Sequence, residues 1–434
     1  MLNSKYWTEY HNKKMTAEEA LSHIKTGDVI GTSQCGVDPK TLLGKLHTIT
    51  PKVTDLTMMC GMCVNEYPFM NDPTYKEHFT LDGIFFMGAN RAAHKLGLLS
   101  AFPANLHNGA GRWVEAHRPN VFIGQATPMD DHGYFCISLC LIHEKEMLES
   151  ADLVILEVNP NLPRVFGDTE VHIRDVDCIV EVDTEIAKLP YAKPSQVDME
   201  IGRHIASLVN DGDTIQLGIG GIPDAAAAAL MDKHDLGVHT EMFTNSMGDM
   251  VEAGVITGKK KSLHKGKMVG VFAYGEQRLY DMIHDNPSIM LMRGSYVNHP
   301  AVVAQNDNMV SINTTLAVDL TGQCCSESIG SRQYSGSGGA SDTCIGAIHS
   351  KGGRSIVAIH STTKGGTLSS INAQLAPGSV VTISRNDVDY IVTEYGIAPI
   401  RGRSVRDRVN NLIAIAHPDF RAELRRDAEK NMLW

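Results

Sequence analysis

Short apolar runs alternate with amphipathic stretches along most of the chain. The runs "LVILEV", "TIQLGI", "SIVAIH" and "SVVTIS" are rich in β-branched residues, which is typical of buried strands. Segments with helical periodicity, such as "SQVDMEIGRHIASLVN", lie between such runs. Strands that alternate with helices favour a mostly parallel sheet covered by helices, so the pattern predicts an α/β protein.

Two signatures recur in the same order in the two halves of the chain. Residues 23–43 and 208–228 share the motif Gly-Asp-x-Ile, followed by a short strand, a glycine and a proline that opens a helix. Residues 150–159 ("SADLVILEVN") resemble residues 387–396 ("DVDYIVTEYG"): each has an aspartate, an apolar run and then a glutamate, Glu157 or Glu394. We therefore predict an internal duplication: two similar open α/β domains, each with a mostly parallel sheet.

The boundary between these domains is predicted near residue 190. A chain of 434 residues is too long for one compact core. The stretch "EIAKLPYAKPSQVD" (residues 185–198) contains two prolines and is interpreted as the linker. The predicted N-terminal domain therefore spans residues 1–190, and the predicted C-terminal domain spans residues 191–434.

Composition excludes several classes of partner. The 39 basic and 50 acidic side chains give a net charge of −11, which argues against nucleic acid or an anionic membrane. The N-terminal residues lack the apolar core of a signal peptide, and no run has the length of a membrane span. The nine cysteines are an odd number and are scattered, as expected for reduced thiols, so we expect a cytoplasmic protein. The "CGMC" at residues 60–63 and the pair Cys324 and Cys325 are interpreted as structural.

Two glycine-rich segments are candidates for anion binding. In "GIGGIP" (218–223) a strand passes into an alanine-rich helix, where exposed backbone N–H groups and the helix N-terminus favour an anion. Pro223 at the helix start and the lack of a following Gly-Lys-Ser/Thr disfavour the dinucleotide and Walker fingerprints. The second segment is "YSGSGGASD" (334–342). Tight packing or a flexible loop explains either segment alone, but the two together favour an anion or oxyanion site.

Glu241, in "GVHTEMF" (237–243), is an isolated acid in apolar and neutral company. A structural acid is one interpretation; a general base, a metal ligand and a covalent nucleophile are the others. No HxxxH or HExxH spacing supports a metal site, and no G-x-S-x-G supports a serine nucleophile. A carboxylate nucleophile beside N–H donors is the interpretation that uses both the acid and the glycine segments.

Taken in order, these segments resemble the acetyl-CoA hydrolase/transferase group of class I CoA-transferases. Within that group the likeness is greatest to the 4-hydroxybutyrate and butyryl-CoA:acetate CoA-transferases. The resemblance covers nearly the whole chain. It is carried by residues 157–173, 215–225, 237–243, 253–268, 296–323 and 384–408.

The resemblance implies a role for each matching residue. Glu241 is implied to be the catalytic glutamate that becomes a glutamyl-CoA thioester, with Asn313 and Glu394 as auxiliary active-site residues. The implied CoA contacts are Gly218, Ile219, Gly220, Gly221, Ile222, Leu316, Gly338 and Gly339. Some relatives carry alanine where this chain has Gly221, a change expected not to alter the chemistry. Lys259, Lys260 and Lys261 are expected to be solvated or to meet the CoA phosphates.

The function implied is transfer of CoA between a short-chain acyl-CoA and a carboxylate such as acetate. CoA is then a substrate, and neither a tightly bound cofactor nor a metal is expected; the family also implies a homodimer or higher homo-oligomer. Three alternatives stay open at this point. An acyl-CoA hydrolase would use the same glutamate, a CoA-binding sensor would have no catalysis, and an NAD-linked dehydrogenase is disfavoured by Pro223.

Overall fold

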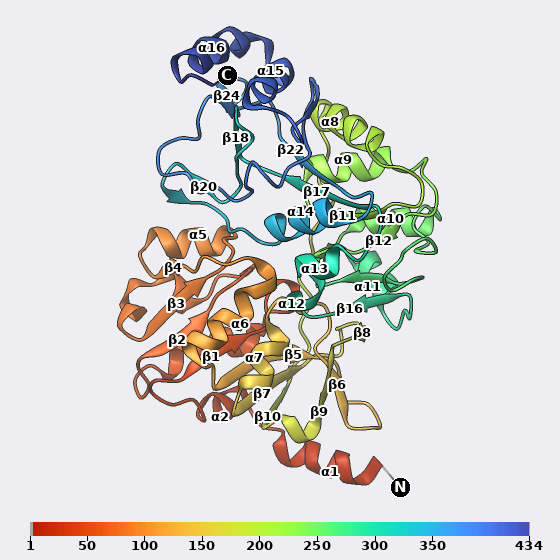
Figure 1. The fold of residues 1–434 in the computed structure, drawn as a ribbon. Helices are drawn as coiled ribbons and strands as arrows, with labels where there is room; N and C mark the ends of the chain where they lie inside the picture. The colour runs from red at the N-terminus through yellow and green to blue at the C-terminus, as the bar shows by residue number, and fades with distance from the viewer. Residues whose placement is uncertain (1–2, 434) are drawn as a thin grey trace. The chain divides into compact units, whose positions relative to one another are not determined.

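The computed structural model describes residues 3–433 and divides into two compact units (Figure 1). The first unit comprises Met1–Leu189 together with Val271–Tyr296, and the second comprises Pro190–Gly270 together with Val297–Trp434. The chain therefore crosses between the units after residues 189, 270 and 296. Each unit is built around its own sheet.

The first unit contains a seven-stranded sheet in the order β10-β7-β5-β1-β2-β3-β4, and all of its strand pairs are parallel. The strand β5 is buried along its whole length, as expected for a parallel sheet covered on both faces. The strands are β1 Val29–Thr32, β2 Leu56–Met59, β3 Phe79–Gly83, β4 Leu99–Ala101, β5 Val121–Ala126, β7 Leu153–Val158 and β10 Cys178–Glu181. The helices are α1 Asn3–Lys13, α2 Ala17–Leu21, α3 Lys40–Lys45, α4 Pro68–Asn71, α5 Gly88–Lys95, α6 Leu106–His117, α7 Glu144–Ser150 and α11 Gln277–Ile283.

The second unit contains a six-stranded sheet in the order β12-β11-β17-β22-β26-β27. All of its pairs are parallel except β26 with β27. The strands are β11 Thr214–Leu217, β12 Gly237–Val238, β17 Met309–Thr314, β22 Arg354–Ala358, β26 Tyr390–Thr393 and β27 Gly396–Pro399. The helices are α8 Gln196–Ser207, α9 Gly221–Ala229, α10 Asn245–Glu252, α13 Pro300–Val303, α14 Ala340–His349, α15 Val405–Ile415 and α16 Pro418–Lys430, and α12 Gly294–Val297 holds the last crossing.

Short strands and 3₁₀ turns complete the units. The 3₁₀ turns are Cys35–Val37, Leu46–Ile49, Pro73–Glu77 and Ile173–Asp175. The short strands are β6 Tyr134–Cys136, β8 Phe166–Gly167, β9 Glu170–His172, β13 Met242–Phe243, β14 Met268–Gly270, β15 Phe272–Ala273, β16 Ile289–Leu291, β18 Ala317–Asp319, β19 Cys324–Cys325, β20 Ser328–Ile329, β21 Arg332–Gln333, β23 Thr362–Thr363, β24 Leu368–Ser369 and β25 Ile371–Asn372. The predicted strand "SVVTIS" is wrong, because this run forms a loop with one isolated bridge at Ile383.

The prediction of an α/β protein with two similar, mostly parallel sheets is confirmed. Five strands of the first sheet, β10-β7-β5-β1-β2, have the same order as β26-β22-β17-β11-β12 in the second. The Gly-Asp-x-Ile motifs occupy equivalent turns before β1 and β11. In each, the aspartate accepts a hydrogen bond from the backbone N–H three residues earlier, Asp28 from Lys25 at 2.7 Å and Asp213 from Asn210 at 2.6 Å.

The predicted correspondence between residues 150–159 and residues 387–396 is wrong. Asp177, before β10, accepts a hydrogen bond from the backbone N–H of Val154 on β7 at 2.8 Å. Asp389, before β26, accepts the equivalent bond from Ser355 on β22 at 3.0 Å. The stretch at 387–396 therefore corresponds to the segment around β10 and not to β7. Consequently Glu157 and Glu394 do not occupy equivalent positions in the two sheets.

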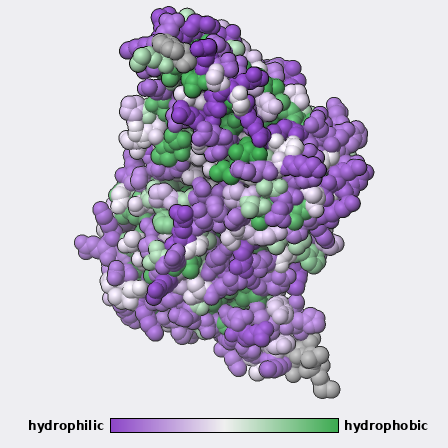
Figure 2. Space-filling model, in the orientation of Figure 1, coloured by the Kyte–Doolittle hydropathy of each residue, from purple (hydrophilic) through white to green (hydrophobic). Residues whose placement is uncertain are grey.

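The distribution of polar and apolar side chains is that of sheets covered by helices, with polar groups outside and apolar groups buried. The face shown in Figure 2 is mainly hydrophilic, with apolar side chains in scattered patches. Separate clusters of buried apolar residues lie under the sheet of each unit, around Ile30 in the first and Val357 in the second. Within residues 3–433 no helix has the length and apolar character needed to cross a membrane.

Candidate active site

Glu241 meets the N-terminus of α14 within the second unit. It lies between the two-residue strands β12 and β13, and its carboxylate accepts a hydrogen bond from the backbone N–H of Gly339, the residue that precedes α14. The side-chain Nδ2 of Asn298 donates to Glu241 Oε2 at 3.2 Å. A Cβ atom on Gly339 would lie 2.1 Å from that same oxygen, so only glycine permits this approach. The predicted nucleophile and the second glycine segment are therefore in direct contact.

The surroundings of Glu241 raise the pKa of its carboxyl group to about 7. Burial is the largest cause, because it disfavours the charged form, and the negative charge of Asp342 in the first turn of α14 acts in the same direction. The hydrogen bonds from Asn298 and from the Gly339 N–H lower the pKa and offset part of this effect. A carboxylate with a pKa near neutrality is more basic than an ordinary glutamate, which suits a nucleophile.

Removal of the Asp342 charge is expected to make Glu241 more acidic. In Asp342→Asn a buried side chain keeps its shape and loses its like charge, so the pKa of Glu241 falls. The acidic limb of the profile of kcat/KM against pH should then move to lower pH. The ratio of kcat/KM at pH 6 to kcat/KM at pH 8 should be several-fold higher in the variant than in the wild type. Initial rates measured between pH 5 and pH 9 test this, and thermal unfolding checks that the variant is folded. An unmoved limb would mean that Asp342 does not act on the titrating group.

The first glycine segment leads from β11 into α9. Gly220 has φ 115°, a left-handed conformation that favours glycine, and no side chain caps the first turn of α9. Its backbone N–H groups are therefore open to a ligand, and Ile219 beside them is 38% exposed. Ile222 is buried, and its predicted contact with CoA stays a prediction. Thr240 Oγ1 donates to the Leu217 and Met242 carbonyls at 3.4 and 3.1 Å, which links this segment to that of Glu241.

Gly221 is constrained by a side chain behind it. A Cβ atom there would lie 2.7 Å from Asp198 Oδ2. Asp198 is itself held by the backbone N–H of Ser195 at 2.8 Å and by Nε2 of His360 at 2.7 Å. An alanine at this position would thus require Asp198 to move in this chain.

The remaining predicted residues differ in their surroundings. Leu316 is 39% exposed, and its contact with CoA stays a prediction. Asn313, on β17, donates through Nδ2 to Ser311 Oγ at 2.8 Å and to Thr343 Oγ1 on α14 at 3.1 Å, so it joins the sheet to the helix behind Glu241. Glu394 accepts hydrogen bonds from the backbone N–H and Oγ of Ser361 at 3.0 and 2.5 Å. The auxiliary roles of Asn313 and Glu394 stay predictions.

Sequence reasoning missed Asn298 and Asp342. Asn298 is 1% exposed, and its Oδ1 is buried with no hydrogen-bond partner among the described residues. A polar residue between the apolar "YV" and "HPAVV" was the available signal. The expectation for Lys261 was wrong, since this side chain is 3% exposed and its Nζ donates to the backbone carbonyls of Val238 and Lys267. It is neither solvated nor free to meet a phosphate.

Metal-ligand clusters and reactive thiols are the other candidate chemistries. Within residues 3–433 no group of three or more His, Cys, Asp or Glu side chains is arranged to hold a metal ion. The cysteine thiols are free and all but Cys63 are buried; burial raises the pKa of Cys178 to about 11, which disfavours a reactive thiolate.

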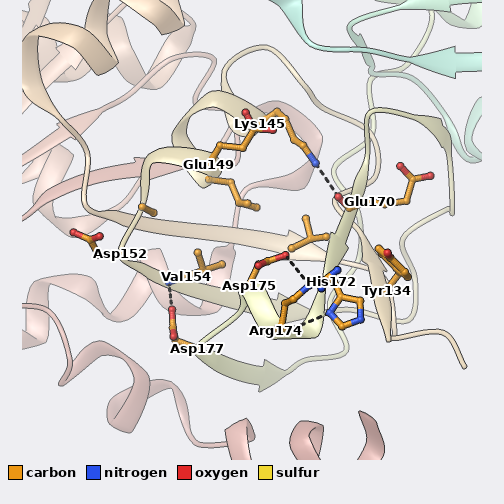
Figure 3. A pocket seen from close by; sticks show the side chains of 13 residues that line it. Tyr134, Lys145, Glu149, Asp152, Val154, Glu170, His172, Arg174, Asp175 and Asp177 are labelled. Atoms are coloured by element: carbon orange, nitrogen blue, oxygen red, sulfur yellow. Dashed lines mark hydrogen bonds and ion pairs between the residues drawn. The ribbon is translucent and has the colours of Figure 1, made fainter. Parts of the chain in front are cut away.

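A hollow of about 540 Å³ lies in the first unit, and Figure 3 shows the side chains that line it. Several of its charged side chains contact other groups of the protein. Lys145 donates to the Glu170 carbonyl at 2.8 Å, Arg174 pairs with Asp175 at 3.8 Å, and Asp177 caps the N–H of Val154. None of the predicted site residues lines this hollow, so Glu241 and its partners remain the candidate active site.

Known protein families match both halves of the chain. Residues 2–190 match the acetyl-CoA hydrolase/transferase N-terminal domain, and residues 275–428 match the C-terminal domain of the same name. A 4-hydroxybutyrate coenzyme A transferase from Clostridium kluyveri is 41% identical over 98% of this chain and 99% of its own. A succinyl-CoA:cyclohexane-1-carboxylate CoA transferase from Geobacter metallireducens is 39% identical over 98% and 97%. The crystal structure of RipA from Yersinia pestis superposes with a TM-score of 0.94 at 35% identity, covering 99% of this chain and all of that one.

Proposed function

The chain belongs to the acetyl-CoA hydrolase/transferase family, and on this premise we propose that it is a CoA-transferase acting on short-chain acyl-CoA. It moves CoA from a donor such as butyryl-CoA or 4-hydroxybutyryl-CoA to a carboxylate acceptor such as acetate. The reaction is ping-pong and passes through a glutamyl-CoA thioester on Glu241. We further propose that CoA enters only as a substrate and that the enzyme is a cytoplasmic homodimer or higher homo-oligomer.

The contact between Glu241 and Gly339 is the observation that carries this function. A carboxylate whose pKa is raised to about 7 lies against a backbone N–H at the start of α14. The same donor can stabilise the oxyanion that forms when the glutamyl carbonyl is attacked, because it already donates to the carboxyl group that becomes this carbonyl. One such donor contributes about 3 kcal/mol to a transition state of this type.

Two exchanges at carbonyl carbon produce the thioester. The Glu241 carboxylate attacks the carbonyl of the acyl-CoA, and the C–S bond breaks. CoA thiolate is expelled, and the product on the enzyme is a mixed acyl–glutamyl anhydride. The thiolate then attacks the glutamyl carbonyl and expels the first acid as its carboxylate, which leaves glutamyl-CoA. The incoming carboxylate reverses both steps. No bond to water is made, so the energy of the thioester is conserved and no ATP is consumed.

The glycine segment at 218–222 is proposed to bind CoA through its open N–H groups and the N-terminus of α9. Binding energy from this part of the substrate, remote from the reacting carbonyl, can be used to orient and desolvate that carbonyl. Exclusion of water is essential, because water would hydrolyse the anhydride and convert transfer into hydrolysis.

The acyl group is assigned only as a short chain. The two curated relatives carry names with acids as different as 4-hydroxybutyrate and cyclohexane-1-carboxylate, at nearly equal identity to this chain. Rates with a panel of acyl-CoA donors and carboxylate acceptors will assign the pair, with acetyl-, butyryl-, 4-hydroxybutyryl- and succinyl-CoA as the first donors.

Mass spectrometry after incubation with butyryl-CoA, without acceptor and with a borohydride quench, tests the covalent step. We expect a CoA adduct on the intact protein, or reduction of the Glu241 side chain to an alcohol in its peptide. An unmodified Glu241 with steady release of CoA would identify a hydrolase. If the acyl-CoA panel gave neither adduct nor turnover, the chain would be a binding protein and the proposed function would fail.

A further inference from the structure

The segment that carries Glu241 has little regular structure of its own. The strands on either side of it, β12 and β13, are two residues long each, and Glu241 belongs to neither. The backbone N–H groups of His239 and Thr240 donate to the carbonyls of Ile215 and Val269 at 3.2 and 2.9 Å. The position of the carboxylate therefore depends on side chains packed behind this segment.

Lys261 is the first of these side chains. Its Nζ donates to the Val238 carbonyl at 2.6 Å and to the Lys267 carbonyl at 3.0 Å. Its stem packs on Gly237, where a Cβ atom would come within 2.3 Å of Lys261 Cγ. A lysine is rarely buried without a carboxylate partner, and here one of its hydrogen bonds goes to the carbonyl of Val238, three residues before Glu241.

His239 is the second. Its ring is 1% exposed, and Nε2 lies 2.8 Å from the carbonyl of Val297. A carbonyl only accepts, so Nε2 carries the proton and Nδ1 does not, and Nδ1 is buried with no partner among the described residues. Burial, with the charge of Lys261, lowers the pKa of His239 to about 3, which keeps the ring neutral. Val297 precedes Asn298, the residue that donates to Glu241.

We propose that His239 and Lys261 are positioning residues for Glu241, acting as a brace that holds the Asn298 amide on the carboxylate. One side of the brace fixes the backbone before Glu241, and the other fixes the backbone before Asn298. This inference rests on the proposed role of Glu241 but concerns its position, which can be measured without turnover.

The test compares His239→Leu, which removes the donor, with His239→Gln, which keeps an N–H at the position of Nε2. In His239→Leu the Asn298 hydrogen bond weakens; since this bond lowers the pKa of Glu241, that pKa rises. We expect kcat to fall about 10²-fold, as for a displacement of about 1 Å. We also expect KM for acyl-CoA to change little and the acidic limb of the pH–rate profile to move to higher pH. His239→Gln should restore kcat and the limb.

A titration of Glu241 by ¹³C NMR gives the readout that is independent of catalysis, with Glu241→Gln used to assign the signal. His234→Leu is the matched control, because that ring is 78% exposed and should leave kcat and the pKa of Glu241 unchanged. If His239→Leu fails to fold, Lys261→Met replaces it, with the same expected rise in the pKa of Glu241.

The brace is overturned if the pKa of Glu241 and the acidic limb match those of the wild type in both His239→Leu and Lys261→Met. It is also overturned if activity falls only in proportion to the folded fraction. If the wild type forms no glutamyl-CoA adduct while His239→Leu still raises the pKa of Glu241, the brace stands and the proposed function fails.

Discussion

Glu241→Gln is expected to abolish CoA transfer, with a fall in kcat of at least about 10⁴-fold, and to give no covalent CoA adduct. The amide has nearly the shape of the carboxylate and can still accept from Asn298 and Gly339, but it is neutral and not nucleophilic. Glu241→Asp keeps the charge and withdraws it by one methylene, so a smaller fall of about 10²-fold is expected.

Glu241→Gln is also expected to stabilise the folded protein. The pKa of Glu241 is raised from its ordinary value of 4.5 to about 7 in the folded protein. Above pH 4.5 the unfolded chain carries this carboxyl group ionised, so folding must either bind a proton or bury the charge. Stability is therefore lost as the pH rises from about 4.5 to 7, and the cost above pH 7 has an upper limit of about 3 kcal/mol. Glu241→Gln removes that cost, so its unfolding free energy at pH 8 should exceed that of the wild type.

Intact mass spectrometry, steady-state rates and urea unfolding at pH 5 and pH 8 measure the three effects together. Glu429→Gln, an exposed change on α16, is the control and should alter none of them. An inactive variant that is more stable than the wild type cannot be explained by damage to the fold. Retained transfer in Glu241→Gln would rule out this residue as the nucleophile.

Local sequence patterns predicted the sheets because parallel strands are apolar along their whole length. The runs at β7, β11 and β22 are buried strands in the structure for that reason. The same property explains the wrong match between residues 150–159 and residues 387–396, since buried parallel strands resemble one another in sequence. The distinguishing residue is the aspartate that caps the neighbouring strand, Asp177 or Asp389, and its role is visible only when both strands are in place.

The candidate site was predictable only where one short segment carries the signal. Glu241 stands out as an isolated acid, and glycines at 338 and 339 mark a close approach. Asn298 lies 57 residues away in sequence within an apolar stretch, and Asp342 lies 101 residues away at the end of the second glycine segment. Nothing in either local context links the side chain to Glu241. Only the fold brings them to Glu241. The return of residues 271–296 to the first unit likewise has no local signal, because it is a matter of packing between distant segments.

The second large effect is expected from Gly339→Ala, which should lower kcat by about 10²- to 10³-fold. Gly339 has φ −97° and ψ 10°, a conformation that alanine can adopt, so the backbone is not strained. The added methyl group would instead lie 2.1 Å from Glu241 Oε2 and 1.9 Å from Asn298 Nδ2. Both groups must move, and the carboxylate loses the geometry in which it meets the N–H of residue 339.

Overpacking of this kind also costs about 1–3 kcal/mol of stability, so activity must be compared at equal folded fraction. Gly111→Ala on α6 is the matched control, because no atom lies within 4 Å of its added methyl and alanine favours a helix. The hydrogen bonds from Asn298 and Gly339 lower the pKa of Glu241, and Gly339→Ala weakens them. The acidic limb of its pH–rate profile should therefore also move to higher pH. Wild-type kcat with an unmoved limb would show that the reacting carboxylate does not occupy this position. A lower kcat with a raised limb would place the chemistry at Glu241, where the added methyl group displaces both the carboxylate and the Asn298 amide that donates to it.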